Sequence, residues 1–305
     1  MPRSFKQKIH KKAFETESRL CRKLNQKHGL RPTSSPYVSG DSFRAMADHV
    51  FDETRQPDPI DIKNASIVFV KTDMLDAFAD RILPQINEPF ILVTHNSDHH
   101  IERHHTELAG NHKIHRWFAQ NALLQHDKII QIPIGLENRW WHKNGIIKDF
   151  RRLASSLPQK KPRILYAFTL NTNEKERRPA LEALKRCPVA DTVTGLDSRS
   201  YRKLLAEYMF VASPPGNGID CHRTWEALYL NTLPIMKSEA FYDGFPNLPS
   251  WPVNDWKALE SLNEQALEDR YNALTMTPNE TEYLWMPYWE EVIHKEQAEC
   301  MRNSI

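Results

Sequence analysis

Short apolar runs alternate with amphipathic stretches along most of the chain. Runs of this length, bounded by glycine, proline and other turn residues, are typical of buried strands, and the stretches between them have helical spacing. In the first half the expected strands are 37–41, 66–70, 90–94 and 129–134, and the expected helices are 42–52 and 74–82. Strands that alternate with helices at this spacing predict a mostly parallel sheet.

The second half of the chain repeats this alternation. Its expected strands are 163–168, 209–212 and 233–236, and its expected helices are 177–186, 200–208, 221–230, 259–274 and 280–305. Residues 151–162 are polar, basic and interrupted by proline, so they are the expected linker between two domains. The predicted organisation is a basic helical segment at 1–30, an acceptor-side α/β domain at 31–155, a nucleotide-sugar-binding α/β domain at 156–280 and a final helix at 281–305.

One stretch organises the second half. From Tyr208 to Met236 it reads YMFVASPPGNGIDCHRTWEALYLNTLPIM, which predicts a strand, a loop with two glycines, a helix and a further strand. Asp220 is expected at the N-cap of the helix, because its carboxylate can accept N–H groups of the first turn, and Asn231 is the expected left-handed stop. In an open parallel sheet such a loop lies at the carboxyl ends of the strands, where ligands bind.

Arg223 and Glu226 are three residues apart and therefore share one face of this helix. A cation in the first turn opposes the helix dipole, and a bound diphosphate would remove that conflict through charge-assisted hydrogen bonds. Glu226, one turn further on, is suited to accept the two hydroxyls of a ribose. The alternative is a plain turn followed by a surface ion pair, which contributes under about 1 kcal/mol.

The segment FVASPPGNGIDCHRTWEALYLNTLPIM resembles the donor-binding segment of exostosin-type glycosyltransferases. Their pattern is an apolar strand, a Pro/Gly loop, Arg-x-Trp-Glu-Ala-Leu and a Pro-containing strand. The resemblance implies a GT-B fold, in which two Rossmann-like domains face each other across a cleft and a final helix crosses back onto the first domain. Arg223 matches the family's phosphate-binding arginine and Glu226 its ribose-binding glutamate. The N-terminal half does not match the family's acceptor domain residue by residue.

A second turn is expected beside this loop. After the strand at 163–168 the chain reads LNTN and enters a helix with two arginines near its start, which resembles the first βα unit of a GT-B donor domain. The alternative for these polar residues is helix capping and solvation. The expected donor-binding residues are Asn171, Asn173, Arg178, Gly216, Asn217, Gly218, Asp220, His222, Arg223 and Glu226.

The loop from His95 to His115 reads HNSDHHIERHHTELAGNHKIH and follows the strand at 90–94. Because it leaves the carboxyl end of a strand, it should face the cleft. One hypothesis is metal binding, since His100 and His104 are four residues apart and can share a helix face. Another is a polar loop that is merely rich in histidine. The third hypothesis, acceptor binding and general base catalysis, is the one we adopt.

Under that hypothesis Asp98 or a nearby side chain removes a proton from a sugar hydroxyl. The expected catalytic residues are Asp98, His99 and Glu102. The segment GLENRWWH at 135–142 should also lie at the cleft, where indole rings can stack on sugars, although paired tryptophans equally suit packing. The expected acceptor-binding residues are Asn96, Asn138 and Trp140.

Composition adds bounds on partners and location. The net charge of +2 over 305 residues gives no case for nucleic acid as a partner, and four scattered cysteines argue against a disulfide framework. No apolar run is long enough for a transmembrane helix and no signal peptide is evident, so we expect a cytoplasmic protein. Residues 1–30 differ, with nine Lys or Arg against two Glu. They predict basic amphipathic helices that either pack on the domain or contact the inner face of an anionic membrane.

The sequence therefore predicts a glycosyltransferase that moves a sugar from a nucleotide-sugar to a glycan or lipid-linked glycan, as in surface polysaccharide biosynthesis. We expect it to need no metal and no other cofactor, because a helix N-terminus and an arginine supply the charge neutralisation. The alternatives are a glycan-acting α/β hydrolase, which the absence of a Gly-x-Ser-x-Gly motif disfavours, and a non-catalytic nucleotide or glycan-binding module.

Overall fold

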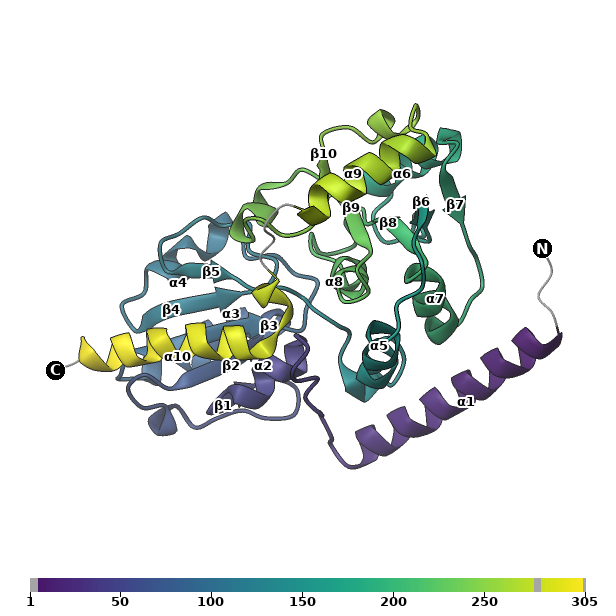
Figure 1. Ribbon diagram of the computed structural model, residues 1–305. Coiled ribbons are helices and arrows are strands. Elements are labelled where there is room, and N and C mark those ends of the chain that lie inside the picture. Colours follow the sequence, from purple (N-terminus) through teal and green to yellow (C-terminus); the bar gives the residue numbers. More distant parts are fainter. Residues whose placement is uncertain (1–4, 277–280, 304–305) are drawn as a thin grey trace.

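The computed structural model describes residues 5–276 and 281–303, which form two α/β domains (Figure 1). Each domain is built on a five-stranded sheet in which every strand pair is parallel. The first sheet has the order β1-β2-β3-β4-β5, with β1 His49–Phe51, β2 Ile67–Lys71, β3 Phe90–His95, β4 Ile114–Ala119 and β5 Ile129–Gln131. The second has the order β10-β9-β8-β6-β7, with β6 Lys161–Tyr166, β7 Ala190–Thr192, β8 Tyr208–Ala212, β9 Leu233–Lys237 and β10 Trp251–Val253. The predicted α/β fold class, with two Rossmann-like domains, is confirmed.

The helices fill the connections between the strands. The α-helices are α1 Phe5–Lys27, α2 Gly40–Met46, α3 Leu75–Arg81, α4 Thr106–Gly110, α5 Ile147–Ala154, α6 Glu174–Arg186, α7 Ser198–Leu205, α8 His222–Leu228, α9 Glu264–Met276 and α10 Met286–Arg302. Short 3-10 helices lie at Pro59–Asp61, Thr72–Met74, Leu83–Gln85, Arg103–His105, Arg139–Trp141, Ala240–Gly244, Trp256–Leu259 and Glu282–Leu284. Within the described ranges no helix is both long and apolar enough to cross a bilayer.

The first sheet is buried on both faces, and its strands sort their side chains between two cores. Along β2, Ile67 and Phe69 point into the core that contains α2 and α10, whereas Val68 and Val70 point into the core that contains α3. Successive side chains of a strand point to opposite faces, so a continuous apolar run fills both layers. The core on the α10 side continues into the second domain and includes Trp225 of α8.

The second sheet is built in the same way. Phe210 and Ala212 of β8 point into a core that α6 and α9 cover, whereas Val211 between them points toward α8 and the first domain. This alternation follows from the period of two along a strand. It holds the carboxyl end of β8, and the loop that follows it, against the first domain.

Helix α10 returns to the first domain, as predicted. Figure 1 shows it (yellow) lying across the first sheet, although it follows the second domain in the chain. Trp289 and Ile293 are buried in the core shared with Phe43 of α2, and the N–H of Met286 donates to the carbonyl of Pro36 at 2.8 Å. The return helix therefore ties the ends of the two-domain unit together.

Several element predictions need correction. Residues 37–41 form only isolated bridges, because α2 begins already at Gly40 and ends at Met46, and the predicted helix at 42–52 therefore includes strand β1. The strand expected at 129–134 stops at Gln131, ahead of Pro133, which has no N–H for a ladder. Residues 151–154 of the expected linker are helical. Strands β4, β7 and β10 were not predicted.

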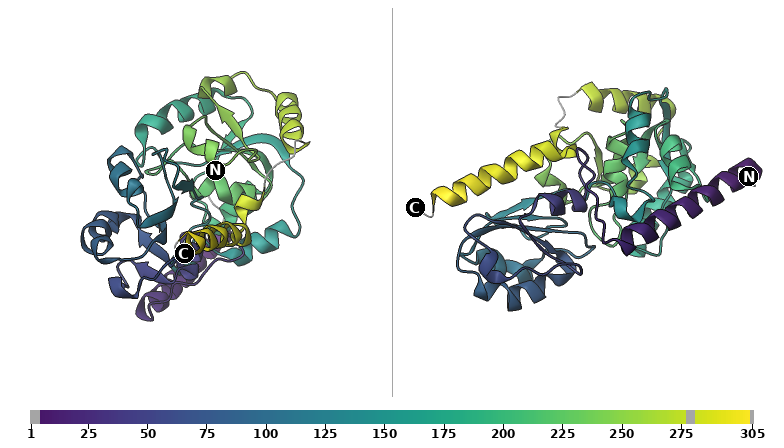
Figure 2. Two further views of the ribbon diagram at one scale, coloured as in Figure 1. Left: turned by 90° about the vertical axis from the view of Figure 1, so that its left-hand side faces the viewer. Right: turned by 90° about the horizontal axis from the view of Figure 1, so that it is seen from below.

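Helix α1 lies along the second domain beside α7 (Figure 2). Phe14 is its buried contact residue, with the Arg199 guanidinium 5.1 Å from the centre of the Phe14 ring. Nearer its end, Asn25 donates to the carbonyl of Trp140 at 3.0 Å. Leu20 and Leu24 remain 59% and 47% exposed. The apolar stripe predicted for this segment is thus only partly used for packing.

Candidate functional site

A cleft of about 890 Å³ lies between the two domains. Its walls are mainly the loops that follow β6, β7 and β8, so it sits at the carboxyl ends of the second sheet, where open parallel sheets bind ligands. The first domain contributes Asp98 after β3 and Ile134 after β5. The predicted cleft between two Rossmann-like domains is therefore present.

Two arginines meet in this cleft without an acidic partner. The guanidinium carbons of Arg177 and Arg223 lie 5.9 and 5.8 Å from the centre of the Phe168 ring. Arg177 is buried and donates to the carbonyls of Pro215 and Thr169 at 2.8 Å each. Neither arginine forms an ion pair with any residue in 5–276 or 281–303. Burial, together with the charge of Arg223, lowers the pKa of Arg177.

Polar atoms beside these arginines lack protein partners. Nη1 of Arg223 and the hydroxyl of Tyr201 are buried beside each other, and neither makes a hydrogen bond of normal geometry to a described residue. Glu226 is only 7% exposed and lines the same cleft, and burial raises its carboxyl pKa to about 7. Buried polar groups without partners cost free energy unless a ligand or water satisfies them. The shared helix face predicted for Arg223 and Glu226 therefore points into a cavity.

The glycine loop after β8 is held by the first domain. Asn217 donates to the carboxylate of Asp98 at 3.0 Å, and the N–H of Ile219 donates to Nε2 of His100 at 3.1 Å. Gly218 allows a close approach, because a Cβ there would lie 2.6 Å from Nδ2 of Asn121. The first domain thus fixes one end of the glycine loop.

Asp220 does not cap helix α8. The helix begins one residue later than predicted and its N-cap is Cys221, whose side chain makes no capping hydrogen bond. The buried carboxylate of Asp220 instead accepts from the N–H groups of Ile134 and Cys221, each at 2.8 Å, and from the Trp225 indole at 2.8 Å. Burial raises its pKa to about 7. Asp220 is a cross-link between the domains.

His222 stands at the start of α8, where the two domains meet. Its Nδ1 lies 2.7 Å from the carbonyl oxygen of Gly135, which can only accept, so Nδ1 carries the proton. Nε2 has no hydrogen-bond partner among the described residues. The ring borders the cleft of about 890 Å³ and also a second cavity of about 530 Å³ in the first domain.

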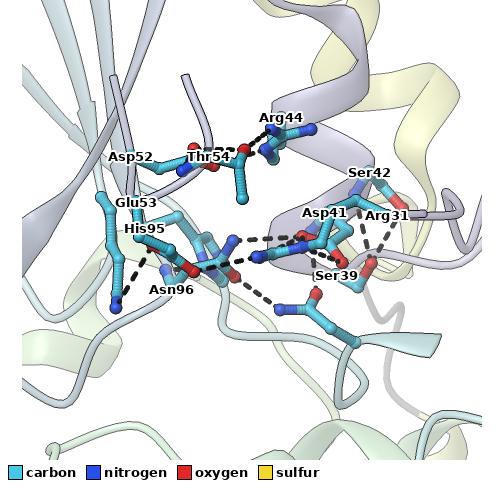
Figure 3. Close-up of polar contacts among 12 residues, drawn as sticks. Arg31, Ser39, Asp41, Ser42, Arg44, Asp52, Glu53, Thr54, His95 and Asn96 are labelled. Atoms are coloured by element: carbon cyan, nitrogen blue, oxygen red, sulfur yellow. Dashed lines mark hydrogen bonds and ion pairs between the residues drawn. The ribbon is translucent and has the colours of Figure 1, made fainter. Parts of the chain in front are cut away.

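The second cavity contains a polar network that positions two of the predicted acceptor-binding residues. Figure 3 shows Arg31 and Asn96 converging on the buried carboxylate of Asp41. Arg31 binds it with contacts of 2.7 to 3.0 Å, and Asn96 donates to it at 3.3 Å. Asn138 donates to the side-chain oxygen of Asn96 at 2.7 Å. Asn96 and Asn138 line this second cavity and not the cleft of about 890 Å³, where they were expected, and the supporting pair Arg31–Asp41 was not predicted.

His95, at the floor of this cavity, is a neutral histidine. It is 1% exposed, its Nε2 lies 3.1 Å from the carbonyl oxygen of Pro133, and its Nδ1 accepts from the N–H of Asn96 at 2.6 Å. Burial lowers its pKa to about 3. Both ring nitrogens are engaged, so His95 holds the backbone in place and has no lone pair to offer a ligand.

Two further first-domain residues lie elsewhere than predicted. Trp141, not Trp140, lines the second cavity. Trp140 stacks on Trp141 with ring centres 4.1 Å apart and packs under the guanidinium of Arg31 at 5.4 Å. Glu102 borders neither cavity and lies 3.6 Å from Nδ1 of His100. Its peptide N–H donates to Nδ1 of His105 at 3.1 Å, and its carbonyl accepts from the N–H of His105 at 2.9 Å.

Asp98 and His99 stay beside the cavities. Asp98 borders both of them, and His99 borders the second with its side chain 72% exposed and 3.9 Å from Asp73. No group of three or more His, Cys, Asp or Glu side chains with a geometry for metal binding occurs in the part of the chain that the structure describes. His104 stacks against His105, with ring centres 3.8 Å apart.

After β6, the arginine that lines the cleft is the neighbour of the one that was predicted. Arg178 is 54% exposed and pairs with Glu174 outside the cleft, whereas Arg177 enters it. The positions of the residues around the helix explain which arginine enters the cleft, because Arg177 shares a face with the buried Ala180 and Leu184. Asn171 does not line the cleft, although the adjacent Thr172 does.

Asn173 has two structural contacts. Its side-chain oxygen accepts from the N–H of Glu176 at 3.2 Å and so caps α6, and its Nδ2 donates to the carbonyl of Gly216 at 2.9 Å. The remaining predicted donor residues, Gly216, Asn217, Gly218, Asp220, His222, Arg223 and Glu226, all line the cleft of about 890 Å³.

Among known proteins, similarity to this chain is found at the level of three-dimensional structure. No protein-family model matches the sequence, and no curated protein matches it. The chain is similar to a solved structure described as the crystal structure of the GtfA/B complex, with a TM-score of 0.44 and 9% sequence identity. The match covers 78% of this chain and 59% of that chain.

Proposed function

We propose that this protein is a glycosyltransferase that uses a nucleoside-diphosphate sugar as donor. The observation that carries the proposal is the pair Arg177 and Arg223, two guanidinium groups on one phenylalanine ring in an interdomain cleft without a carboxylate partner. Two adjacent cations repel each other, all the more because Arg177 is buried, and a diphosphate neutralises both through charge-assisted, bidentate hydrogen bonds.

The residues beside the arginines suit the rest of a nucleotide. Glu226 is buried one turn along α8 with no hydrogen-bond partner among the described residues, so its oxygens are available to the two ribose hydroxyls. The buried hydroxyl of Tyr201 adds a polar group beside Arg223. A ribonucleotide would satisfy polar atoms that the protein itself leaves unpaired.

The acceptor is proposed to occupy the second cavity. Asn96, Asn138 and the exposed edge of Trp141 are the amide and indole groups that bind sugar hydroxyls and sugar faces. This cavity and the donor cleft share Asp98, Ile134 and His222, so the two ligands would meet at that boundary. A reaction between two bound molecules needs such an arrangement, in which the reacting atoms approach within about 3–3.5 Å.

We propose further that no divalent cation takes part. In this arrangement the leaving diphosphate is neutralised by Arg177 and Arg223, which perform the electrostatic role that a metal has in other enzymes.

Other classes make different use of the same cleft. A glycan hydrolase needs a pair of available carboxylates. Of the three described carboxylates that line the cleft, Asp220 is fully engaged by three N–H donors and Asp98 accepts from Asn217, which leaves Glu226 without a matching partner. A binding module would use the two cavities without turnover.

One assay separates these classes. The purified protein is incubated with a panel of nucleoside-diphosphate sugars, with and without oligosaccharide acceptors, and released nucleoside diphosphate is measured. A transferase releases it in an acceptor-dependent manner. Release of reducing sugar from the glycans alone would indicate a hydrolase, and tight nucleotide binding without release would indicate a binding module. Either result would overturn the proposal.

We also propose that α1 contacts an anionic membrane surface. Its described part carries Leu20 and Leu24 exposed and adjacent on one face, with Lys23 and Lys27 beside them. Basic residues near anionic lipid each contribute about 1 kcal/mol, and exposed leucines insert at the interface. A lipid-linked acceptor would be delivered by such a contact.

A further inference from the structure

We propose that His222 is the general base of the transfer, the group that removes the proton from the attacking hydroxyl of the acceptor. The inference rests on the proposed function and assigns the proton transfer within it. It differs from the hypothesis drawn from the sequence, which gave this role to Asp98 and placed His222 among the donor-binding residues.

The first support is the fixed tautomer of His222. Nδ1 lies 2.7 Å from the carbonyl oxygen of Gly135, so it must be the protonated nitrogen and must donate. Nε2 then has a lone pair and no hydrogen-bond partner in residues 5–276 and 281–303. A backbone acceptor behind the ring is the usual device by which a protein selects one imidazole tautomer.

Gly135 makes this contact possible. Its φ is +63°, and a Cβ at this position would lie 2.2 Å from the carbonyl oxygen of Val38. A larger residue therefore cannot take its place without moving the backbone. The N–H of Leu136 donates to Val38 O at 2.8 Å, which fixes the peptide that presents Gly135 O to His222. Gly135 is a positioning residue for the imidazole.

The second support is location. His222 borders both the donor cleft and the acceptor cavity, and it precedes Arg223 by one residue on α8. An acceptor hydroxyl that approaches the sugar at this boundary passes between the two cavities. A general base must lie within hydrogen-bond reach of that hydroxyl, and the boundary is where such reach exists.

The other candidates are less suited to the role. Asp98 uses one carboxylate oxygen to accept from Asn217 at 3.0 Å, and this contact holds the glycine loop against the first domain. His95 has both nitrogens engaged and a pKa lowered to about 3 by burial. His99 borders only the acceptor cavity.

The titratable and charged groups that share a cavity with His222 come from both domains. Strand β3 ends in His95 and the loop after it contributes Asp98, the loop after β5 contributes Glu137, and α8 contributes Arg223 and Glu226, with Asp220 just ahead of the helix. Glu137 is occupied by Asn144, which donates to it from its backbone at 2.9 Å and from its side chain at 3.1 Å. The imidazole therefore has no dedicated carboxylate partner within the described part of the chain and relies on Gly135 for its orientation.

The proposed step balances as a direct displacement. The acceptor oxygen forms a bond to the anomeric carbon of the donor sugar while its proton passes to Nε2 of His222. The bond from that carbon to the diphosphate oxygen breaks, and the diphosphate leaves with the electron pair beside Arg177 and Arg223. The imidazolium that results then loses its proton to water.

The test uses the donor and acceptor that the panel assay identifies. His222→Gln, which cannot accept a proton, should lower turnover by about 10²–10⁴-fold and leave the calorimetric affinity for the nucleoside diphosphate within about twofold. His222→Ala should recover turnover at least about tenfold when free imidazole is added. His112→Gln, at an exposed histidine far along the chain, is the matched control and should behave as the wild type.

Turnover of His222→Gln within about tenfold of the wild type would overturn the assignment. Loss of donor affinity together with turnover, without rescue by imidazole, would also overturn it and make His222 a donor-binding residue. These outcomes differ from failure of the proposed function itself. In that case the wild-type protein releases no nucleoside diphosphate with any combination of donor and acceptor.

Discussion

Asn217 donates a 3.0 Å hydrogen bond to Asp98 and so joins the glycine loop of the second domain to the histidine-rich loop of the first. The two residues are 119 positions apart in the chain, and their contact lies where the interdomain cleft meets the second cavity. Any movement of the two domains that widens the cleft here would have to break this bond. The contact therefore offers a direct way to separate loop closure from chemistry.

The substitution Asp98→Asn tests this separation. Its new amide can donate to the side-chain oxygen of Asn217 as well as accept from its nitrogen, so the loop contact is preserved and only the charge is lost. We expect turnover to fall by less than about tenfold, far less than for His222→Gln. Steady-state kinetics on Asp98→Asn and His222→Gln measures this difference in turnover. A fall of about 10²-fold or more at unchanged donor affinity would return the proton transfer to Asp98.

Adjacent arginines on α6 provide a matched pair for the donor site. Arg177→Ala should weaken binding of a nucleoside diphosphate by about 1.5–3 kcal/mol, the range for hydrogen bonds to charged groups, and Arg223→Ala should do the same. Arg178→Ala should leave the affinity unchanged, since Arg178 is exposed and pairs with Glu174. Calorimetric titration of the three variants measures this.

If Arg177→Ala and Arg178→Ala bind the nucleoside diphosphate with equal affinity, the arginine pair is not part of the proposed donor site. Because Arg177 also holds the loop through the carbonyls of Pro215 and Thr169, Arg177→Lys is a useful addition. Lysine keeps the positive charge but lacks the planar set of N–H donors of arginine. The loss of nucleoside-diphosphate affinity in Arg177→Lys relative to the wild type therefore reports how much of the binding depends on hydrogen-bond geometry.

Local pattern accounts for much of what the sequence predicted. The parallel sheets and the strand–loop–helix around Arg223 follow from apolar periodicity and turn residues, which act over a few positions, whereas the return of α10 was expected from the family resemblance. Asn231 takes its predicted left-handed conformation, with a φ of 53°. Strand β4 was missed because IHRWFA mixes polar and apolar residues, and its pairing with β3 is decided by tertiary contacts.

The site was harder to predict, for a physical reason. Whether Arg177 or Arg178 enters the cleft depends on a rotation of about 100° around one helix, and only the buried face of that helix decides it. The contacts of His222 with Gly135 and of Asp98 with Asn217 join residues far apart in sequence. No local pattern encodes such pairs, so the sequence indicated which loops matter but not the partner of each side chain.

Glu226 should make stability depend on pH. Its pKa is about 7 in the folded protein because of burial, against about 4.3 in an unfolded chain. The folded state therefore holds an extra proton between these values, and its stability falls as the pH rises through that window. Glu226→Gln removes the effect, so the variant should gain about 2–3 kcal/mol relative to the wild type between about pH 5 and pH 8.

Chemical unfolding at both pH values measures this gain. Glu182→Gln, at an exposed position on α6, is the control and should change stability equally at either pH. Asp220 contributes the same pH dependence to every variant, so its effect cancels in the difference. An equal effect of Glu226→Gln at the two pH values would show that this carboxylate is already stabilised in its charged form.

Treatment with a chelator tests whether protein side chains alone neutralise the charge of the leaving diphosphate. If Arg177 and Arg223 supply it, turnover of the pair found in the panel assay should survive exhaustive treatment with a chelator. Addition of magnesium or manganese to the treated enzyme should then change the rate by less than about twofold. Complete loss of turnover, restored by one particular metal ion, would redirect attention to the histidines of the loop from His95 to His115.

Helix α1 can be tested without any substrate. Leu20 and Leu24 are exposed on one face of a helix whose described part also carries eight Lys or Arg. We expect the protein to sediment with vesicles rich in phosphatidylglycerol and not with vesicles of phosphatidylcholine alone. The double variant Leu20→Asp, Leu24→Asp should lose this binding, because two carboxylates in the contact face oppose both insertion and charge attraction.

The control for this double variant is Ile60→Asp, which places a carboxylate at an exposed apolar position of the first domain, 66% accessible, far from α1. It should sediment as the wild type does. Salt at about 0.5 M should weaken wild-type binding, since it shortens the range of electrostatic attraction to well under 10 Å. Equal sedimentation of the wild type and the double variant would mean that α1 does not face the membrane, and its exposed leucines would then need another partner.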